Sequence, residues 1–218
     1  MVPFKNRLDA GEKLAEKIHL GKDDKNPIVL GIPRGGISIG YPIALKLKCP
    51  LEPITLRKLP IPQNDQMGFG AVTLNRNVML NKRLINAGYV SKNEIEGIVD
   101  EVYEEVLRRD RLYRGSRPFP NLKGRTVIIV DDGLATGFTM LGAISFAREN
   151  HALKITCAVP VAHDNAYTLV SHEVDSIICL HIDRGYSFAV ASFYQSFPDM
   201  EDREVISILK KIHGPAEK

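Results

Sequence analysis

The chain has 218 residues, 44% of them hydrophobic and 25% charged, with a formal net charge of +3. This composition is ordinary for a soluble globular protein, and we expect one α/β domain that spans residues 1–218. The mild positive charge suits an anionic small molecule and does not by itself indicate nucleic acid. No apolar run approaches the roughly 20 residues of a membrane helix, and the first residues lack a signal peptide's apolar core, so we expect a cytoplasmic protein.

The three cysteines, Cys49, Cys157 and Cys179, are far apart in the sequence and form no C-x-x-C pair. Their spacing therefore indicates neither a zinc site nor a disulfide framework. Each lies in or beside an apolar strand-like run, so we expect buried and reduced thiols.

The first strand–loop–helix unit is predicted after a helix over about 8–19. Residues 28–32 favour a strand, which leads through Pro33-Arg34-Gly35-Gly36 into a helix over about 38–47. Glycines at such a joint let backbone amides approach an anion, and Arg34 offers a forked donor to phosphate oxygens. Taken alone, this loop is equally consistent with a tight turn.

A long loop is predicted between a strand at 53–56 and a hairpin made by 71–74 and 78–81. Residues 59–70 contain two prolines, two glycines and polar residues, without an apolar period. A loop of this length in a compact domain is often functional, and we expect it to be mobile without ligand. Lys58, at a strand end, is a candidate phosphate contact. A plain surface loop and a solvated lysine are the alternatives.

The longest helix is predicted over about 91–114. Ser91 and Glu94 form a capping-box pattern, and apolar residues follow along one face. Basic residues are frequent from Arg108 to Arg125, where cations near a helix C-terminus are favourable on their own account. An anion or subunit contact is a second interpretation of these residues. Nucleic acid is the least favoured, because no aromatic residues are interleaved with the charges.

The most informative stretch is 126–139. Four β-branched apolar residues occupy 127–130 without alternation, which favours a strand buried on both faces. Asp131 and Asp132 follow, then a small-residue loop and a helix over 140–149. Loop amides and a helix N-terminus suit a phosphate, and strand-end carboxylates accept hydrogen bonds from sugar hydroxyls. The alternatives are a turn capped by aspartate and a Walker-B strand, but this chain has no G-x-x-x-x-G-K-[ST] loop.

The last third of the chain continues the alternation of strands and helices. We predict strands at 154–162 and 175–180, a helix over 164–171 between them, and a closing amphipathic helix over 199–213. Alternating strands and helices predict a parallel sheet with right-handed crossovers.

Two histidines and a group of aromatic residues in this third are further candidates. His163 and His181 each follow a strand, so each could face a ligand, although a lone histidine is more often structural. Residues 186–197 are rich in aromatics, which could stack on a planar base or pack under the last helix. No histidine spacing suggests a metal held by the protein.

The stretch 126–139 resembles the phosphoribosyl pyrophosphate (PRPP) signature of type I phosphoribosyltransferases: an apolar strand, two acids, a small-residue loop and Thr-Gly-x-Thr. The order of motifs from about residue 28 to residue 202 resembles that of one branch of this family, whose members are usually described only as predicted phosphoribosyltransferases. The segments that carry this likeness are 31–36, 57–59, 68–71, 130–137 and 193–197. The resemblance implies a type I phosphoribosyltransferase-like α/β fold: a parallel sheet with flanking helices, a flexible loop or hairpin, and a small hood.

The resemblance also implies an activity and a site. The activity is transfer of the 5-phosphoribosyl group from PRPP to a nitrogen acceptor, a nucleobase or an amine, with release of pyrophosphate. Mg²⁺ would be bound mainly by PRPP oxygens and water, not by the protein alone. Asp131 and Asp132 would hold ribose hydroxyls or metal waters, and a non-proline cis peptide is implied just before Arg34. The residues implied in substrate binding are Arg34, Gly35, Gly36, Lys58, Gly133, Leu134, Ala135, Thr136, Gly137, Phe138 and Thr139.

The acceptor stays open. Hypoxanthine–guanine members place an aspartate directly before Thr-Gly, where this chain has Ala135. The sequence of residues 134–137 is closer to that of the adenine and uracil types. No base-recognition segment matches either. A PRPP- or nucleotide-sensing regulator with little catalysis is the alternative function, because a fold does not fix a function. We therefore expect PRPP and an unidentified acceptor as partners and no membrane, with nucleic acid the least favoured partner and a homodimer as one candidate association.

Overall fold

The computed structural model describes residues 2–62 and 64–214, and its larger sheet confirms the predicted parallel topology. This five-stranded sheet has the order β2-β1-β6-β7-β8, and every neighbouring pair is parallel. Its strands are β1 (Ile28–Gly31), β2 (Leu51–Pro53), β6 (Thr126–Val130), β7 (Lys154–His163) and β8 (Ser176–Asp183). Because all run the same way, their carboxyl ends meet at one edge of the sheet.

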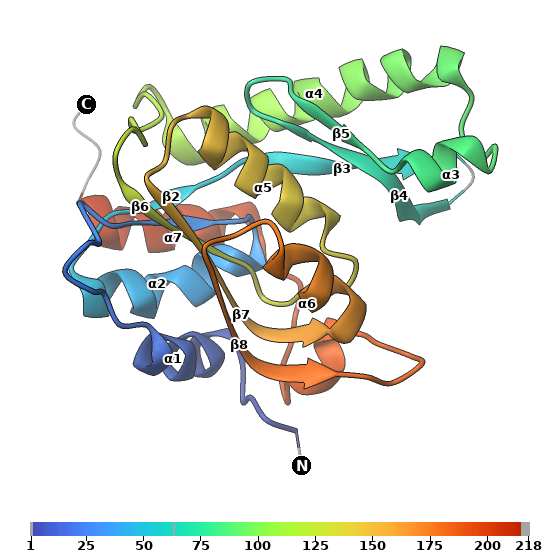
Figure 1. The fold of residues 1–218 in the computed structure, drawn as a ribbon. Helices are drawn as coiled ribbons and strands as arrows, with labels where there is room; N and C mark the ends of the chain where they lie inside the picture. The colour runs from blue at the N-terminus through green and yellow to red at the C-terminus, as the bar shows by residue number, and fades with distance from the viewer. Residues whose placement is uncertain (1, 63, 215–218) are drawn as a thin grey trace.

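Helices cover both faces of this sheet (Figure 1). One face carries α1 (Arg7–Lys17) and α2 (Gly35–Leu47), with α7 (Asp202–His213) packed on α2; the other carries α5 (Phe138–Glu149) and α6 (Asp164–Ser171). Ile128 faces the first group and Ile129 the second, and both are buried. Burial on two faces explains why the strand sequences are apolar without alternation.

A second layer, which we call the hood, stands on α5. It consists of β3 (Leu56–Ile61), β4 (Asn64–Thr73), β5 (Val78–Leu80), α3 (Lys82–Asn86) and α4 (Lys92–Arg114). Its three strands form an antiparallel sheet, which packs on α4 through a small core of its own. Figure 1 shows the hood projecting from the parallel sheet beyond α5. The expected hood and the hairpin predicted over 71–74 and 78–81 are confirmed.

The prediction of a long loop over 59–70 is wrong. Apart from the β3–β4 turn, whose residue 63 lies outside the described residues, this segment is paired strand. The register shifts on both sides of Pro60, which lies opposite Gly68, and these irregularities hid the alternation from sequence analysis. One face is nevertheless apolar and buried, through Leu59, Ile61 and Phe69. The predicted mobility of this segment stays a prediction.

Two smaller expectations also need correction. The single strand predicted over 53–56 is wrong. β2 ends at Pro53 in the parallel sheet, and β3 begins at Leu56 in the hood sheet. The prediction also lacked α3, which begins where the Asn81 side chain accepts a hydrogen bond from the Arg83 amide at 3.1 Å. Among the described helices, none has the length and apolar character needed to cross a bilayer.

The three cysteines are free, but only one is fully buried. Cys157 lies in the core, whereas Cys49 and Cys179 are half-buried, which corrects the expectation of three buried thiols. Burial raises the pKa of the thiols of Cys49 and Cys179 to about 11 each. All three thiols are therefore protonated at neutral pH and weak nucleophiles.

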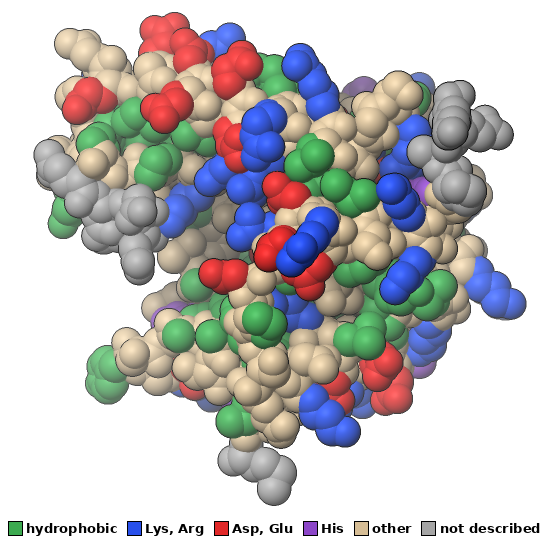
Figure 2. Space-filling model, turned by 180° about the vertical axis from the view of Figure 1, so that it is seen from behind, with side chains coloured by type: hydrophobic (Ala, Val, Ile, Leu, Met, Phe, Trp, Pro, Cys, Tyr) green, Lys and Arg blue, Asp and Glu red, His purple; other side chains and the backbone are tan. Residues whose placement is uncertain are grey.

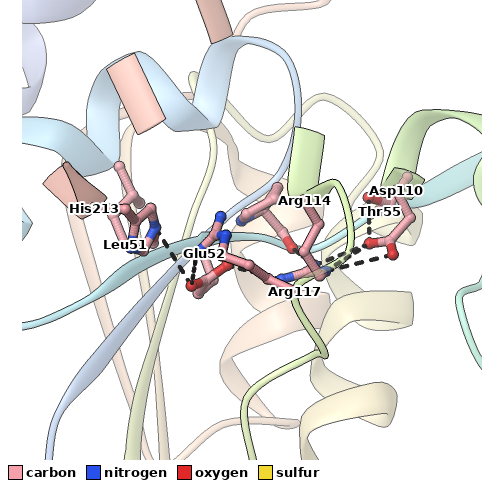
Figure 3. A network of polar contacts seen from close by, with 8 residues as sticks. Leu51, Glu52, Thr55, Asp110, Arg114, Arg117 and His213 are labelled. Atoms are coloured by element: carbon pink, nitrogen blue, oxygen red, sulfur yellow. Dashed lines mark hydrogen bonds and ion pairs between the residues drawn. The ribbon is translucent and has the colours of Figure 1, made fainter. Parts of the chain in front are cut away.

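A buried polar network fastens the hood helix to the parallel sheet (Figure 3). The side chain of Arg114 is 2% exposed and donates to Glu52 of β2 at 2.8 Å and to the Pro53 carbonyl at 2.8 Å. It also pairs with Asp110 one turn earlier, at 2.9 Å. Arg117 and His213 contact the other carboxylate oxygen of Glu52, Oε1, at 3.1 and 3.4 Å. Because α4 carries the hood, this network fixes the hood relative to the strands.

Candidate functional site

The acid pair follows β6 directly, at the carboxyl edge of the parallel sheet. The Asp131 carboxylate accepts a hydrogen bond from the Asp132 amide at 2.8 Å. Burial, and then the neighbouring Asp132, raises the pKa of Asp131 well above its usual range. Burial also raises the pKa of Asp132, and the hydrogen bond and charge of Arg7 oppose that rise. Two adjacent, largely buried acids at a strand end are poised to bind hydroxyl groups or a cation.

The glycines at the start of α2 pack against this pair. A Cβ atom on Gly35 would lie 1.9 Å from Oδ2 of Asp132, and one on Gly36 would lie 2.5 Å from the Val130 carbonyl oxygen. Only glycine therefore allows the helix to begin so close to the acids. The Pro33–Arg34 peptide is cis, as the resemblance implied. The predicted residues of this loop and the acid pair are thus brought together.

The loop after the acids has a buried anchor and an exposed tip. Leu134 is fixed to β7, since its amide donates to Val161 at 2.9 Å and its carbonyl accepts from His163 at 2.9 Å. Ala135 and Thr136 are exposed. Gly137 takes a φ of 81° and begins α5, whose first amides consequently face the loop. Exposed residues that lead into a helix N-terminus form a suitable cradle for a phosphate group.

Lys58 belongs to the hood. It lies on β3, opposite Ala71 of β4, and its side chain runs over Gly68, where a Cβ atom would be 2.2 Å from Lys58 Cγ. By alternation it shares a face with Leu56, whose side chain contacts α5. Lys58 therefore comes from a different layer than the loops that carry the acids and glycines.

Sequence analysis missed Arg7 altogether. Its Nε lies 2.8 Å from Oδ2 of Asp132, its Nη1 donates to the Pro198 carbonyl at 2.7 Å, and its Cζ lies 3.6 Å from the centre of the Phe197 ring. The Tyr194 hydroxyl donates to the Asp132 carbonyl at 2.6 Å. The aromatic run at 186–197 was a signal for this region. Nothing in the sequence pointed to Arg7, which precedes Asp132 by 125 positions.

A second unpredicted group is an arginine cluster around Glu105 of α4. Arg57, Arg108 and Arg109 each donate to this carboxylate, at 2.9, 2.5 and 2.9 Å. The hydrogen bonds and charges of Arg108 and Arg109 lower the pKa of Glu105 to about 2, against the effect of burial. Seen from behind, basic and acidic side chains lie side by side across the middle of the molecule (Figure 2). Burial, then the charge of Arg109 and, more weakly, that of Arg34, lower the pKa of Arg57.

The two candidate histidines lie near the carboxyl ends of β7 and β8. His163 ends β7 and its Nε2 lies 3.2 Å from the Gly185 carbonyl oxygen. The ring of His181 lies 5.1 Å from that of Phe193, centre to centre. Among residues 2–62 and 64–214, no group of three or more His, Cys, Asp or Glu residues is arranged to hold a metal. Both histidines have local partners that account for their positions.

A cavity of about 710 Å³ lies between the hood and the start of α5. The hood lines it with β5 and α3, and the parallel-sheet side with Phe138, Asn165 and Leu169. Phe138 directly follows the exposed loop, so the cavity borders the candidate phosphate cradle. This space is large enough for a small planar molecule.

Comparisons with known proteins agree with this geometry. The family model for the phosphoribosyl transferase domain matches residues 3–192. Two Mycobacterium tuberculosis proteins, named "Putative phosphoribosyl transferase Rv0571c" and "Putative phosphoribosyl transferase MT0597", are each 32% identical over 210 residues, 96% of this chain and 47% of theirs. The chain thus spans about half the length of these curated relatives. The crystal structure of TT1426 from Thermus thermophilus is similar over 97% of this chain and 99% of that chain, with 31% identity and a TM-score of 0.79.

Proposed function

The chain belongs to the type I phosphoribosyltransferase family, and on that premise we propose that it transfers the 5-phosphoribosyl group of PRPP to a nitrogen acceptor. One observation carries this proposal: Gly35 and Gly36 bring the start of α2 against Asp131 and Asp132 at the end of β6. A glycine loop suited to anions and two strand-end acids thereby lie in direct contact. A phosphorylated sugar needs both, because it presents hydroxyls and phosphates together.

Each part of PRPP has a matching group in this proposal. The segment from Ala135 to Thr139, which leads from the exposed loop into α5, holds the 5′-phosphate with its amides and hydroxyls. Asp131 and Asp132 accept hydrogen bonds from the ribose hydroxyls. The pyrophosphate lies at the Gly35-Gly36 amides, with Arg34 as a forked donor and Lys58 reaching in from the hood.

The reaction needs positioning more than a covalent nucleophile. The bond from C1 to pyrophosphate breaks with oxocarbenium character at the sugar, as in glycoside chemistry. Arg34 and the amides beside it stabilise the negative charge that develops on the leaving group. The acids hold the ribose so that the acceptor nitrogen meets C1 from the open side. The cavity beside Phe138 is the space that we assign to the acceptor, whose identity stays open.

Mg²⁺ is part of the proposal as a companion of the substrate. The donor set fits this role, since the acid pair offers two carboxylates, and oxygen ligands suit Mg²⁺. The site provides no third carboxylate or histidine within the described residues, so PRPP oxygens and water would complete the coordination. The ion would supply charge neutralisation at the pyrophosphate.

A screen for PRPP-dependent pyrophosphate release tests the proposal. Purified protein is incubated with PRPP, Mg²⁺ and one nucleobase or amine at a time, and pyrophosphate is measured against a reaction without acceptor. Pyrophosphate release that requires an acceptor supports the transferase function. Tight PRPP binding without pyrophosphate release for any acceptor favours a PRPP-sensing regulator. Absence of PRPP binding contradicts both functions.

A further inference from the structure

Strand β8 forms one edge of the parallel sheet, and no described strand lies beyond it. Within the part of the chain that the structure describes, the only hydrogen bond to a β8 backbone group from outside the β7 ladder comes from the Cys179 thiol to the His181 carbonyl, at 3.1 Å. None of the eight residues of β8 is buried, whereas eight of the ten residues of β7 are. Unpaired N–H and C=O groups along such an edge are a template for another strand.

The opposite edge of the sheet, at β2, is closed. The Pro53 carbonyl accepts a hydrogen bond from Arg114 of α4 at 2.8 Å, and Nε2 of His213 in α7 lies 2.9 Å from the Leu51 carbonyl oxygen (Figure 3). All three β2 residues are buried. The fold thus covers one edge of its sheet with two helices and leaves the other edge, β8, open.

The sequence of β8 is that of a covered strand. Edges that stay single are usually blunted by lysine or proline. β8 reads Ser-Ile-Ile-Cys-Leu-His-Ile-Asp, with neither of these residues and with four Ile or Leu side chains. Ile182 is 36% exposed, and the other three are only half-buried. Covering these side chains would remove apolar surface from water, which favours association.

We propose that β8 is the interface between two copies of this chain: two β8 strands pair antiparallel about a two-fold axis, with Leu180 opposite its own copy, and join both sheets into one. The same edge is used in both copies, so the association closes at the dimer and leaves no open β8 edge. Because the paired strands run in opposite directions, the carboxyl edges of the two sheets lie at opposite ends. Both candidate sites therefore stay open, and the pairing is independent of the proposed function.

The side chains select the register of this pairing. Opposite residues in an antiparallel pair point to the same face, so a two-fold axis perpendicular to the sheet must place one residue opposite its own copy. With Leu180 on the axis, Ile178 lies opposite Ile182 of the partner subunit, and the symmetry repeats this pair. Three apolar pairs then line one face, on which Ile178 and Leu180 already pack against the core that α1 covers.

Charge excludes the neighbouring register. With Cys179 on the axis, Asp175 would lie opposite Asp183 of the partner subunit, twice in each dimer, and like charges directly opposite destabilise a pair. In the first register, Arg184 instead comes beside Asp175 of the partner subunit. The Arg184 side chain is 80% exposed although it lies 3.7 Å from Asp164, so it remains accessible to a second acid. Apolar pairing and charge therefore favour the same register.

Helices on both faces would enlarge the interface. α1 and α6 each contact β8, from opposite faces of the sheet, so each comes toward its own copy across the two-fold axis. α1 carries an exposed apolar side chain, Leu8, which is 45% exposed. Stable protein interfaces bury roughly 1,200–2,000 Å² in total, more than one pair of strands supplies. The flanking helices provide the additional surface.

Sedimentation velocity of the full chain over a range of concentrations tests the proposal. We expect the native protein to sediment as a dimer, at twice the chain mass of 24.3 kDa. Leu180→Lys places two ammonium groups opposite each other and should weaken association at least about tenfold. Leu45→Lys, at a 54% exposed position of α2, is the matched control and should remain dimeric. A monomeric native protein, or a Leu180→Lys variant as dimeric as the control, overturns the proposal.

A mixture of two variants tests the register and separates lost pairing from lost folding. Leu180→Glu alone should also be monomeric, because two carboxylates then meet. Mixed with Leu180→Lys it should form a dimer, because lysine then lies opposite glutamate. A mixture that stays monomeric contradicts the pairing of residue 180 with its own copy.

Circular dichroism checks the fold of each variant. Should the Leu180 variants fail to fold, Ile182→Lys changes a more exposed side chain of the same strand. It places a charge opposite Ile178 of the partner subunit, so it should be monomeric beside the dimeric Leu45→Lys control. A dimer as stable as that control overturns the proposal.

Discussion

Helix α2 begins so close to the acid pair that a Cβ atom on Gly35 would lie 1.9 Å from the carboxylate of Asp132. Gly35→Ala must therefore displace either the helix start or the carboxylate. We expect it to destabilise the protein by about 1–3 kcal/mol, as overpacking does. We also expect PRPP affinity to fall at least tenfold, which corresponds to about 1.4 kcal/mol. Urea unfolding and calorimetric titration measure the two effects.

Gly97→Ala is the matched control. Gly97 is exposed within α4, and a Cβ atom there would meet nothing within 4 Å. Alanine in a helix interior stabilises by roughly 0.5–1 kcal/mol relative to glycine, so this variant should be as stable as the native protein or more so, with unchanged affinity. Native affinity in Gly35→Ala would show that the close approach is unimportant for binding.

Thr136→Val tests the exposed loop. The substitution keeps the shape of the side chain and removes a hydroxyl that we expect to donate to the 5′-phosphate. Hydrogen bonds to charged groups contribute roughly 1.5–3 kcal/mol, so affinity for ribose 5-phosphate should fall about tenfold or more. Stability should change little, because Thr136 is exposed. Thr168→Val, at an exposed position of α6, is the control, and equal affinities in the two variants would argue against a phosphate at Thr136.

Arg114→Met tests the network that fastens the hood. It leaves the carboxylates of Glu52 and Asp110 without their shared cation. Breaking a buried ion pair by removing one partner costs about 3–5 kcal/mol, and we expect the lower end because Arg117 still contacts Glu52. Arg111→Met, at an exposed position of the same helix, should be nearly neutral. Similar urea midpoints for the two variants would contradict the structural role of Arg114.

Glu105→Gln tests the arginine cluster through pH. The hydrogen bonds from Arg108 and Arg109 lower the pKa of Glu105 from 4.5 to about 2, so its ionised form stabilises the folded state above the ordinary pKa. This contribution is lost as the pH falls through the folded pKa. The difference in melting temperature between the native protein and Glu105→Gln should therefore shrink over this acidic range. Glu96→Gln, an exposed control on α4, should show a difference that is small throughout.

The sequence predicted those parts of the molecule that depend on neighbouring residues. The run before Asp131 indicated a strand buried on both faces, and the capping box at Ser91 located the start of α4, where the Ser91 amide donates to Glu94 at 2.9 Å. The β3–β4 pair was missed because Pro60 and Gly68 interrupt the alternation that identifies a strand.

The candidate site likewise has parts that the sequence predicts and parts that only the folded chain shows. The acids and the glycine loop each have a local pattern, whereas their contact with each other follows only from the parallel sheet. Arg7 could not be predicted, because its contact with Asp132 spans 125 positions and depends on how α1 packs on α2 and beside β7. The arginines around Glu105 likewise come from two hood elements that pack together only in the folded chain.

Calorimetric titration of PRPP with Mg²⁺ into the native protein and into the double variant Asp131→Asn with Asp132→Asn tests the central claim most directly. Each hydrogen bond to a charged acceptor contributes roughly 1.5–3 kcal/mol, so the loss of both should weaken binding by far more than tenfold. A thermal melt checks that the fold is kept, and Glu12→Gln with Glu16→Gln, on the exposed side of α1, removes two charges elsewhere. We predict tight binding to the native protein and to this control, and weak or no binding to the double variant. Equal PRPP affinity in all three proteins would contradict the assignment of the acid pair as a PRPP site.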